Sequence, residues 1–361
     1  MAINEQEIQE IVRSVLKGMG TTAAAPAAPK APEKKLLGIF ETADEAIAAA
    51  KAAQKEIQPM PLEFREKIIA NIRKKTLENA KLLSELAVEE TGMGNVGHKI
   101  IKHQLVAEKT PGTEDLKTIA WSGDRGLTLT EMGPWGVIGA VCPSTNPTCT
   151  VICNSIGMLA AGNAVVFMPH PSAKNCSNLA IDMVNRASVE VGGPENIVTA
   201  VAEPTMDVSN YIFKHKDVDM LCATGGPGVV TAVLSSGKRA MGAGAGTPPV
   251  LVDETANIPK AAQDIINGCT FDNNLPCIAE KEVVVVDTVA DELIYHMEQN
   301  GCYHASPEEV QKLVDTVLDD KNGKKVISRK CVGRSAKVLL GKIGVTVGDE
   351  VRCIIFEGEK T

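Results

Sequence analysis

The spacing of hydrophobic and polar residues divides the chain into three parts. Residues 4–19 show helical spacing, with charged residues on most sides and one apolar face made by Ile8, Ile11, Val12, Val15 and Leu16. Residues 20–35 are rich in Ala and Pro, a composition that does not pack and forms a semi-extended tether. The pattern therefore predicts an amphipathic peptide at 1–19, a linker at 20–35 and a folded body from residue 36 onward.

In the body, segments with helical and strand patterns alternate. We expect helices at 42–57, 62–90, 148–159, 172–191 and 207–214, and strands at 136–141, 164–168, 197–201 and 220–223. A short alternating strand at 126–130 fits an exposed oligomer ribbon, and TGMGNVGHK at 91–99 is interpreted as a break. Repeated strand–helix units imply a parallel sheet with right-handed crossovers. The expected fold class is therefore α/β, with a nucleotide-binding type of sheet.

A second α/β unit follows two prolines. Pro248 and Pro249 interrupt the chain, and the pattern then predicts strands at 250–253 and 282–287, helices at 258–267 and 290–300, and a last strand at 352–357. We therefore predict a first domain at 36–246 and a second at 247–361.

Composition and charge narrow the class of protein. The chain has 361 residues, of which 44% are hydrophobic and 23% charged, as is ordinary for a soluble α/β enzyme. A net charge of −8 and only 3% aromatic residues argue against nucleic-acid binding. The stretch 132–173 has no charged residue, but its prolines, glycines and asparagines interrupt any apolar helix. We therefore expect neither a nucleic acid nor a membrane as partner.

The ten cysteines are scattered through apolar segments. They include no C-x-x-C motif, and no His lies at zinc-ligand spacing from a Cys pair, so no metal site is expected. The pattern is typical of reduced, mostly buried thiols in a cytoplasmic protein.

A glycine-rich turn, Thr224-Gly225-Gly226-Pro227-Gly228, lies between a predicted strand and a helix that opens at Val229. Glycines let the backbone approach a ligand, and a helix N-terminus favours a pyrophosphate. Many ordinary turns share this composition, but the strand–turn–helix setting favours a nucleotide-binding role.

Cys277 lies in a polar loop, FDNNLPCIAEK, that follows a predicted helix. A loop thiol beside helix or amide dipoles can react as a thiolate nucleophile. A single cysteine is nevertheless more often a buried core residue. Cys269, which is still on the helix, is interpreted as such a core residue.

The segment Pro143-Ser144-Thr145-Asn146-Pro147 directly follows the strand predicted at 136–141. Loops at the carboxyl end of a parallel strand are where ligands bind, and the amide of an asparagine between prolines could donate to an oxyanion. Taken alone, an ordinary Asn-Pro turn is the preferred interpretation.

In order and spacing, these motifs together resemble the aldehyde dehydrogenase superfamily. GPWGVIGAVCPSTNP is similar to its loop with the oxyanion asparagine, AGNAVVFMPHPSAK to its second nucleotide strand, TGGPGVV to its phosphate turn, MGAGAGTPPVLVD to its interdomain crossing and FDNNLPC to its nucleophile segment. The resemblance extends from Leu36 to the C-terminus. It implies that Cys277 attacks an aldehyde, while Asn146 and the Cys277 backbone N–H hold the oxyanion.

Two departures point to one branch of this superfamily. Hydrolytic members have an acidic general base in a Glu-Leu-Gly-Gly pattern, where this chain has Gly242-Ala243-Gly244-Ala245. Without that carboxylate, water lacks an activator, and the thiol of coenzyme A fits better as the acyl acceptor. The lysine that contacts the adenosine ribose in relatives is here Met168, before Pro169-His170-Pro171. Both features resemble the CoA-acylating propionaldehyde and acetaldehyde dehydrogenases of bacterial microcompartments.

The resemblance implies a short-chain aldehyde as substrate, propionaldehyde or acetaldehyde, with NAD and CoA as cofactor and co-substrate. NADP stays open, because no acidic ribose ligand can be identified. The residues implied to contact the cofactors are Pro143, Ser144, Thr145, Met168, His170, Pro171, Thr224, Gly225, Gly226, Val229, Met241 and Gly242.

The N-terminal peptide at 1–19 is similar to the encapsulation peptides of microcompartment enzymes. The resemblance implies docking on a shell protein or another enzyme inside a cytoplasmic microcompartment, and a homo-oligomer. The alternative is that the apolar face folds back onto the chain's own body.

Two other functions stay open. A hydrolytic aldehyde dehydrogenase would release a free acid without CoA. A catalytically inactive partner or scaffold would bind NAD without turnover. The second alternative has support in the family resemblance, because the family continues beyond Thr361 and the catalytic domain is then expected to be incomplete.

Overall fold

The computed structural model describes residues 35–321 and 323–358. The chain divides into two units, Met1–Leu36 and Leu37–Thr361. The predicted peptide at 1–19, and all but the last residue of the predicted linker, lie outside the described residues.

A six-stranded parallel sheet forms the centre of the first half of the body. Its strands are β1 (Ile39–Phe40), β4 (Val137–Val141), β5 (Ala164–Met168), β6 (Val198–Val201), β7 (Met220–Thr224) and β8 (Arg239–Ala243). They are hydrogen-bonded in the order β1-β6-β5-β4-β7-β8, and every neighbouring pair is parallel. The expected α/β fold with a parallel sheet is therefore confirmed.

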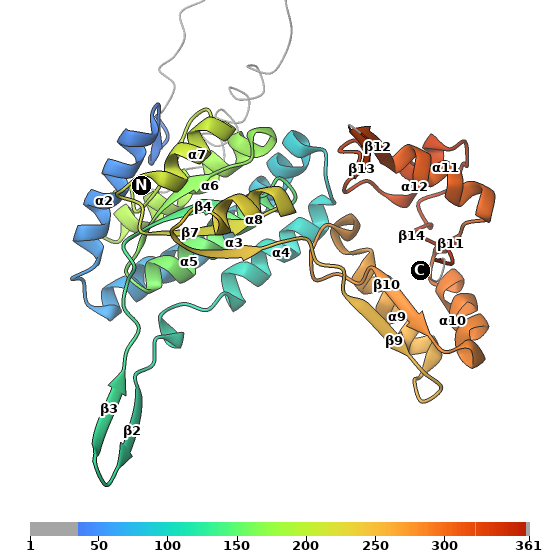
Figure 1. The fold of residues 1–361 in the computed structure, drawn as a ribbon, viewed down its shortest axis with the longest axis horizontal. Coiled ribbons are helices and arrows are strands. Elements are labelled where there is room, and N and C mark those ends of the chain that lie inside the picture. The colour runs from blue at the N-terminus through green and yellow to red at the C-terminus, as the bar shows by residue number, and fades with distance from the viewer. Residues whose placement is uncertain (1–34, 322, 359–361) are drawn as a thin grey trace, which may run out of the picture. The chain divides into compact units, whose positions relative to one another are not determined.

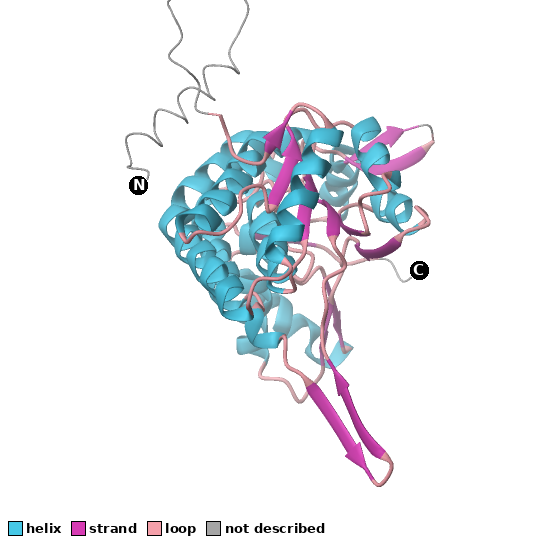
Figure 2. Ribbon diagram, turned by 90° about the vertical axis from the view of Figure 1, so that its left-hand side faces the viewer, coloured by secondary structure: helices cyan, strands magenta, loops and turns pink. Residues whose placement is uncertain are grey.

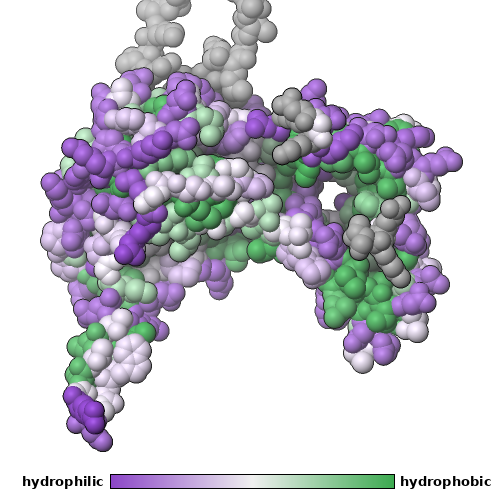
Figure 3. Space-filling model, viewed as in Figure 1, coloured by the Kyte–Doolittle hydropathy of each residue, from purple (hydrophilic) through white to green (hydrophobic). Residues whose placement is uncertain are grey.

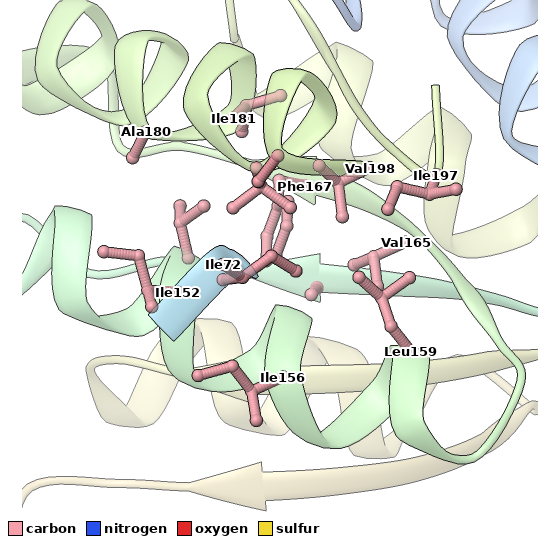
Figure 4. Packing of buried hydrophobic residues seen from close by; sticks show 14 of the residues in the cluster. Ile72, Ile152, Ile156, Leu159, Val165, Phe167, Ala180, Ile181, Ile197 and Val198 are labelled. Atoms are coloured by element: carbon pink, nitrogen blue, oxygen red, sulfur yellow. The ribbon is translucent and has the colours of Figure 1, made fainter. Parts of the chain in front are cut away.

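Helices cover both faces of this sheet (Figure 2). On one face lie α3 (Leu62–Thr91), α5 (Pro147–Ala160) and α6 (Lys174–Glu190); on the other lie α2 (Ala43–Ile57), α7 (Met206–Lys214) and α8 (Pro227–Leu234). In β5, Val165 and Phe167 belong to the first core, whereas Val166 and Met168 belong to the second, as the two-residue period of a strand requires. Figure 4 shows Phe167 at the centre of the first core, where each such fully buried side chain contributes roughly 1.5–3 kcal/mol.

The break predicted at 91–99 is present at residues 92–95, between α3 and helix α4 (Val96–Lys109), but the helix itself was not predicted. Asn95 caps the helix by accepting a hydrogen bond from the His98 N–H. Helix α4 was not predicted because its buried face is mostly polar, so a hydrophobic period is absent. Its buried residues are Lys99, Lys102, His103 and Ala107.

The strand predicted at 126–130 is β3 (Gly126–Thr130), and it forms an antiparallel hairpin with β2 (Ile119–Gly123). Every residue of both strands is exposed, including Trp121 and Leu127. Figure 1 shows the hairpin extending away from the six-stranded sheet, and Figure 3 shows apolar side chains along it.

The rest of the body is built from small sheets and helices. Strands β9 (Pro249–Val252) and β10 (Glu282–Val285) are parallel, as are β11 (Cys302–His304) and β14 (Cys353–Ile355), whereas β12 (Leu318–Lys321) and β13 (Lys324–Ile327) form an antiparallel pair. The helices are α9 (Ile258–Cys269), α10 (Asp287–Gln299), α11 (Pro307–Val317) and α12 (Ala336–Lys342). Short 3-10 turns occur at η1 (Thr113–Asp115), η2 (Pro171–Ala173) and η3 (Phe271–Asn274). No helix within the described residues is long and apolar enough to cross a membrane.

Candidate active site

Cys277 is a solvent-exposed residue. All ten cysteines lie within the described residues and all are free, but the others are buried or partly buried. Burial raises the pKa of Cys149 to about 12, and it raises the pKa of Cys142 further. Buried thiols of this kind are unreactive, whereas Cys277 is the one exposed cysteine among the described residues.

Left-handed backbone precedes this thiol. Asp272, Asn273 and Asn274, in η3 between α9 and β10, have φ angles of 50°, 53° and 60°. Asp and Asn tolerate this conformation better than other residues with a side chain. Each left-handed residue still costs of order 1–3 kcal/mol, and three in succession persist only where surrounding contacts hold them.

Side-chain amides supply part of those contacts. The Asn274 Nδ2 donates to the Cys269 carbonyl at 2.7 Å and to the Glu280 carbonyl at 2.9 Å, so it joins the two ends of the loop. The Asn273 Nδ2 donates to the Gly333 carbonyl at 2.9 Å. The loop is therefore built by side-chain hydrogen bonds.

Lys281 closes the loop from its other side. Its Nζ donates to Asn274 Oδ1 at 2.8 Å, to the Pro276 carbonyl at 3.1 Å and to the Ala279 carbonyl at 3.3 Å. Burial lowers the pKa of Lys281, and the sulfur of Cys277 opposes that shift. The ammonium group of Lys281 thus holds the backbone on both sides of Cys277.

Gly246 packs directly against Cys277. A Cβ atom on Gly246 would collide with the carbonyl oxygen of Cys277, whereas one on Gly244 would meet open space. Neither Gly246 nor Lys281 was predicted to be functional, because nothing in the local pattern marks a contact between residues distant along the chain.

Asn146 lies where β4 ends and α5 begins. It occupies the N-cap position with φ −146° and ψ 59°, but its side chain makes no capping hydrogen bond. Its carbonyl accepts hydrogen bonds from the backbone N–H and the hydroxyl of Thr150. The backbone is thus fixed while the amide side chain is available to a ligand.

The glycine turn connects β7 to α8, and its geometry fits a pyrophosphate. Gly226 is the N-cap of α8 without a side-chain cap, and the space beside its Cα is open. A Cβ on Gly225 would lie 2.8 Å from Val229, so only glycine permits this turn without a shift. Exposed amide groups at such a helix start bind anions.

Next to this turn lies β8, which the sequence analysis did not predict as a strand. The Gly225 N–H donates to the Ala243 carbonyl at 3.1 Å, and a Cβ on Gly242 would lie 2.7 Å from Val230. Met241 is 63% exposed. The predicted cofactor residues 224–226 and 241–242 therefore lie together.

Pro143, Ser144 and Thr145 lie in the loop between β4 and α5, whereas Met168, His170 and Pro171 lie at or just after the end of β5. His170 is half-buried, its Nδ1 accepts a hydrogen bond from the Ser172 N–H, and burial, with Arg329 nearby, lowers its pKa. The side chain of Met168 is only 3% exposed and packs in the core. The carboxyl ends of β4, β5 and β7 meet at one edge of the sheet, so the Asn146 loop, His170 and the glycine turn share that edge.

These features define an α/β protein with a parallel sheet of the kind that nucleotide-binding enzymes use and with one exposed cysteine. Within the described residues, no group of three or more His, Cys, Asp and Glu side chains could hold a metal ion. The family model described as "Aldehyde dehydrogenase family" matches residues 37–326. The chain therefore belongs to the aldehyde dehydrogenase family.

Individual relatives indicate a narrower group. An acetaldehyde dehydrogenase (acetylating) of Bilophila wadsworthia is 45% identical, over 99% of this chain and 76% of the relative. The structure of a propionaldehyde dehydrogenase from the Clostridium phytofermentans fucose utilisation bacterial microcompartment is 61% identical, with a TM-score of 0.86, over 90% of this chain and 74% of that one. The structure of a Rhodopseudomonas palustris propionaldehyde dehydrogenase, with bound CoA and an acylated cysteine, is 51% identical, with a TM-score of 0.85, over 89% and 73%. The predicted resemblance to the CoA-acylating branch is confirmed.

Proposed function

We propose that this chain is a CoA-acylating aldehyde dehydrogenase that converts a short-chain aldehyde, propionaldehyde or acetaldehyde, with NAD and CoA into an acyl-CoA and NADH. The exposure of Cys277 carries the proposal, because the other thiols are buried or partly buried. The relatives named above as acetylating, or with bound CoA and an acylated cysteine, support the same chemistry. They give no comparable support to a hydrolytic enzyme or an inactive scaffold.

The first step is addition of the Cys277 thiolate to the aldehyde carbon, which forms a C–S bond and leaves the negative charge on oxygen. The Asn146 amide and the Cys277 backbone N–H donate to that oxyanion. Lys281, which donates to the carbonyl of Pro276, holds the backbone next to the attacking sulfur.

The oxyanion then collapses, the C–H bond breaks, and a thioester stays on Cys277. NAD, when bound, supplies the hydride acceptor for this step, and the glycine turn with the start of α8 would hold its pyrophosphate. The CoA thiol next attacks the thioester, its sulfur takes the acyl group, and the Cys277 thiol is regenerated. Because residues 242–245 offer no carboxylate, water is not activated to compete.

Mass spectrometry of the protein mixed with propionaldehyde and NAD⁺ tests this function. Without CoA, we expect one propionyl group on the peptide that contains Cys277, and addition of CoA removes it. The Cys277→Ala variant should carry no adduct, whereas the control Cys269→Ala should keep it. Normal NADH production by Cys277→Ala would overturn the assignment, and turnover that does not need CoA would favour the hydrolytic enzyme.

We further propose that residues 1–19 dock on a microcompartment shell protein or on another enzyme. A relative that comes from a bacterial microcompartment supports this placement. Deletion of residues 1–20 should abolish co-purification with shell proteins while CoA-dependent turnover persists. Unchanged co-purification would contradict the proposal.

A homo-oligomer is the proposed assembly. The exposed hairpin β2–β3 supports it, since large apolar side chains in water favour a partner surface. Light scattering should detect an oligomer, and the double change Trp121→Ser and Leu129→Ser should shift it towards the monomer. The control Leu234→Ser, also at an exposed site, should leave the oligomer intact.

A further inference from the structure

Helix α4 carries a buried cluster of charges beside the nucleophile loop. The carboxylate of Asp272 is fully buried, and the side chains of Lys99 and Lys102 are 3% and 10% exposed. Asp272 Oδ2 lies 3.1 Å from the Lys99 Nζ and 2.6 Å from the Lys102 Nζ. Two ammonium groups therefore surround one carboxylate.

One ammonium group is enough to neutralise the Asp272 carboxylate, so charge balance accounts for the presence of only one of the two lysines. A buried ammonium group without its own counter-ion is unfavourable, because it loses its hydration without full compensation. Burial, followed by the neighbouring charge of Lys102, lowers the pKa of Lys99. The second lysine therefore has a cost in stability, which suggests a role beyond neutralising Asp272.

Lys99 also reaches the other catalytic loop. Its Nζ donates to the carbonyl of Thr145 at 3.4 Å, at the long end for a hydrogen bond, and Thr145 directly precedes Asn146. Lys102, in contrast, contacts Asp272 but no residue of the Asn146 loop among the described hydrogen bonds and ion pairs. The two lysines thus differ in one contact near the active site, the hydrogen bond from Lys99 to the Thr145 carbonyl.

Neighbouring residues of α4 strengthen both connections. The His103 Nδ1 donates a hydrogen bond to the Lys99 carbonyl at 2.8 Å, and its Nε2 accepts one from the Thr148 hydroxyl, in the first turn of α5, at 2.9 Å. At the other end, the Asn95 N–H donates to Asp272 Oδ1 at 2.8 Å. The Asp272 N–H donates to His98 Nδ1 at 2.9 Å, and the His98 ring stacks on Phe271. Helix α4 therefore contacts the Asn146 loop and the Cys277 loop at the same time.

We propose that Lys99 is a positioning residue that sets the separation of Asn146 and Cys277, by holding the Thr145 carbonyl and the Asp272 carboxylate together. The inference rests on the proposed function, which assigns the oxyanion to Asn146 and the nucleophile to Cys277. Lys99 acts through these two residues and does not itself contact the substrate.

Two matched variants of the full chain test the proposal. Lys99→Met and Lys102→Met each leave one lysine on Asp272, so their melting temperatures should be similar to each other. Because a displacement of about 1 Å can cost about 10²-fold in rate, Lys99→Met should lower kcat by about 10²-fold with little change in the KM for NAD. Lys102→Met should lower kcat much less.

Hydrogen–deuterium exchange gives a second readout that needs no turnover. In Lys99→Met, exchange should rise in the peptides around 143–150 and around 270–279, whereas in Lys102→Met it should rise only in the second. Equal kcat values in the two variants, or unchanged exchange at 143–150 in Lys99→Met, would overturn the role of Lys99.

Other outcomes separate a structural role from a failure of the proposed function. A melting temperature that falls for Lys99→Met but not for Lys102→Met would show that Lys99 only supports the fold, which overturns the proposal. Absence of an acyl adduct on Cys277 in the unchanged chain would defeat the proposed function itself. An adduct in the unchanged chain together with equal behaviour of the two variants would defeat only the inference about Lys99.

Discussion

The Asn146 loop and the Cys277 loop supply the two halves of the proposed chemistry, but they are held in different ways. The Asn146 loop continues from β4, one of the two central strands of the sheet, into α5, whose residues line a hydrophobic core. The Cys277 loop lies between α9 and β10, and it depends on left-handed backbone and on side-chain hydrogen bonds from Asn273, Asn274 and Lys281.

This difference predicts which substitutions lower stability and which lower activity alone. Residues that support the Asn146 loop belong to the hydrophobic core or to buried hydrogen bonds, so changing them lowers the free energy of unfolding. The side chains of Asn273, Asn274 and Lys281, which support the Cys277 loop, are partly buried or exposed, so changing them should reduce activity while the fold survives. Four experiments test this contrast.

The largest expected effect is the fall in kcat when a donor to the oxyanion is removed. Asn146→Ala should lower kcat by roughly 10²–10³-fold, or about 2.7–4 kcal/mol, because one donor to the developing charge is lost. The Asn146 side chain makes no capping hydrogen bond, so the melting temperature should stay nearly unchanged. Steady-state kinetics and calorimetry measure the two quantities, and a normal kcat would remove Asn146 from the mechanism.

Next is the pH dependence of stability that His103 introduces. Burial lowers the pKa of His103 to about 4, below the value near 6.5 expected in the unfolded chain. The folded state therefore favours the neutral ring. The contribution of the neutral ring to the free energy of unfolding is fully present above about pH 6.5. It is lost as the pH falls towards 4, by up to roughly 3 kcal/mol.

Urea unfolding between pH 7.5 and pH 4.5 measures this loss. His103→Gln removes the titrating ring, so the fall in unfolding free energy over that range should become smaller. Identical curves for His103→Gln and the unchanged chain would show that the ring does not contribute.

The third experiment tests the Cys277 loop without altering charge. Gly246→Ala places a methyl group against the Cys277 carbonyl and should lower kcat by about 10²-fold through displacement of the nucleophile. Gly244→Ala, where the added methyl meets open space, should have nearly full activity. A large loss of melting temperature in Gly246→Ala would contradict the separation of activity from stability.

The smallest expected effect is that of Lys281. Lys281→Met removes the ammonium beside the thiol, and alkylation of Cys277 by iodoacetamide at pH 7 should slow by about tenfold. Mass spectrometry of the Cys277 peptide follows the rate. Lys260→Met, on the exposed side of α9, is the matched control and should not change it. Equal rates would show that Lys281 has no electrostatic role.

Much of the fold could be predicted from local pattern. The strands at 126–130 and 164–168 have the predicted bounds, and Thr42 caps α2 in a capping box, as a threonine three residues before a glutamate indicates. Helix α4 was missed because it buries lysines and a histidine, and partners that pair such groups come from distant segments. Cys277 was identified by its motif, whereas its exposure could not be known from neighbouring residues.

The sequence alone determined the alternation of strands and helices, the glycine turn, and the family resemblance carried by Asn146 and Cys277, because these depend on residues close together along the chain. Only the tertiary structure decided that Lys99 spans two loops, that Gly246 packs against the Cys277 carbonyl and that Lys281 lies beside the thiol. These contacts join residues from different elements, and their energies depend on burial and on distance, neither of which a local pattern encodes.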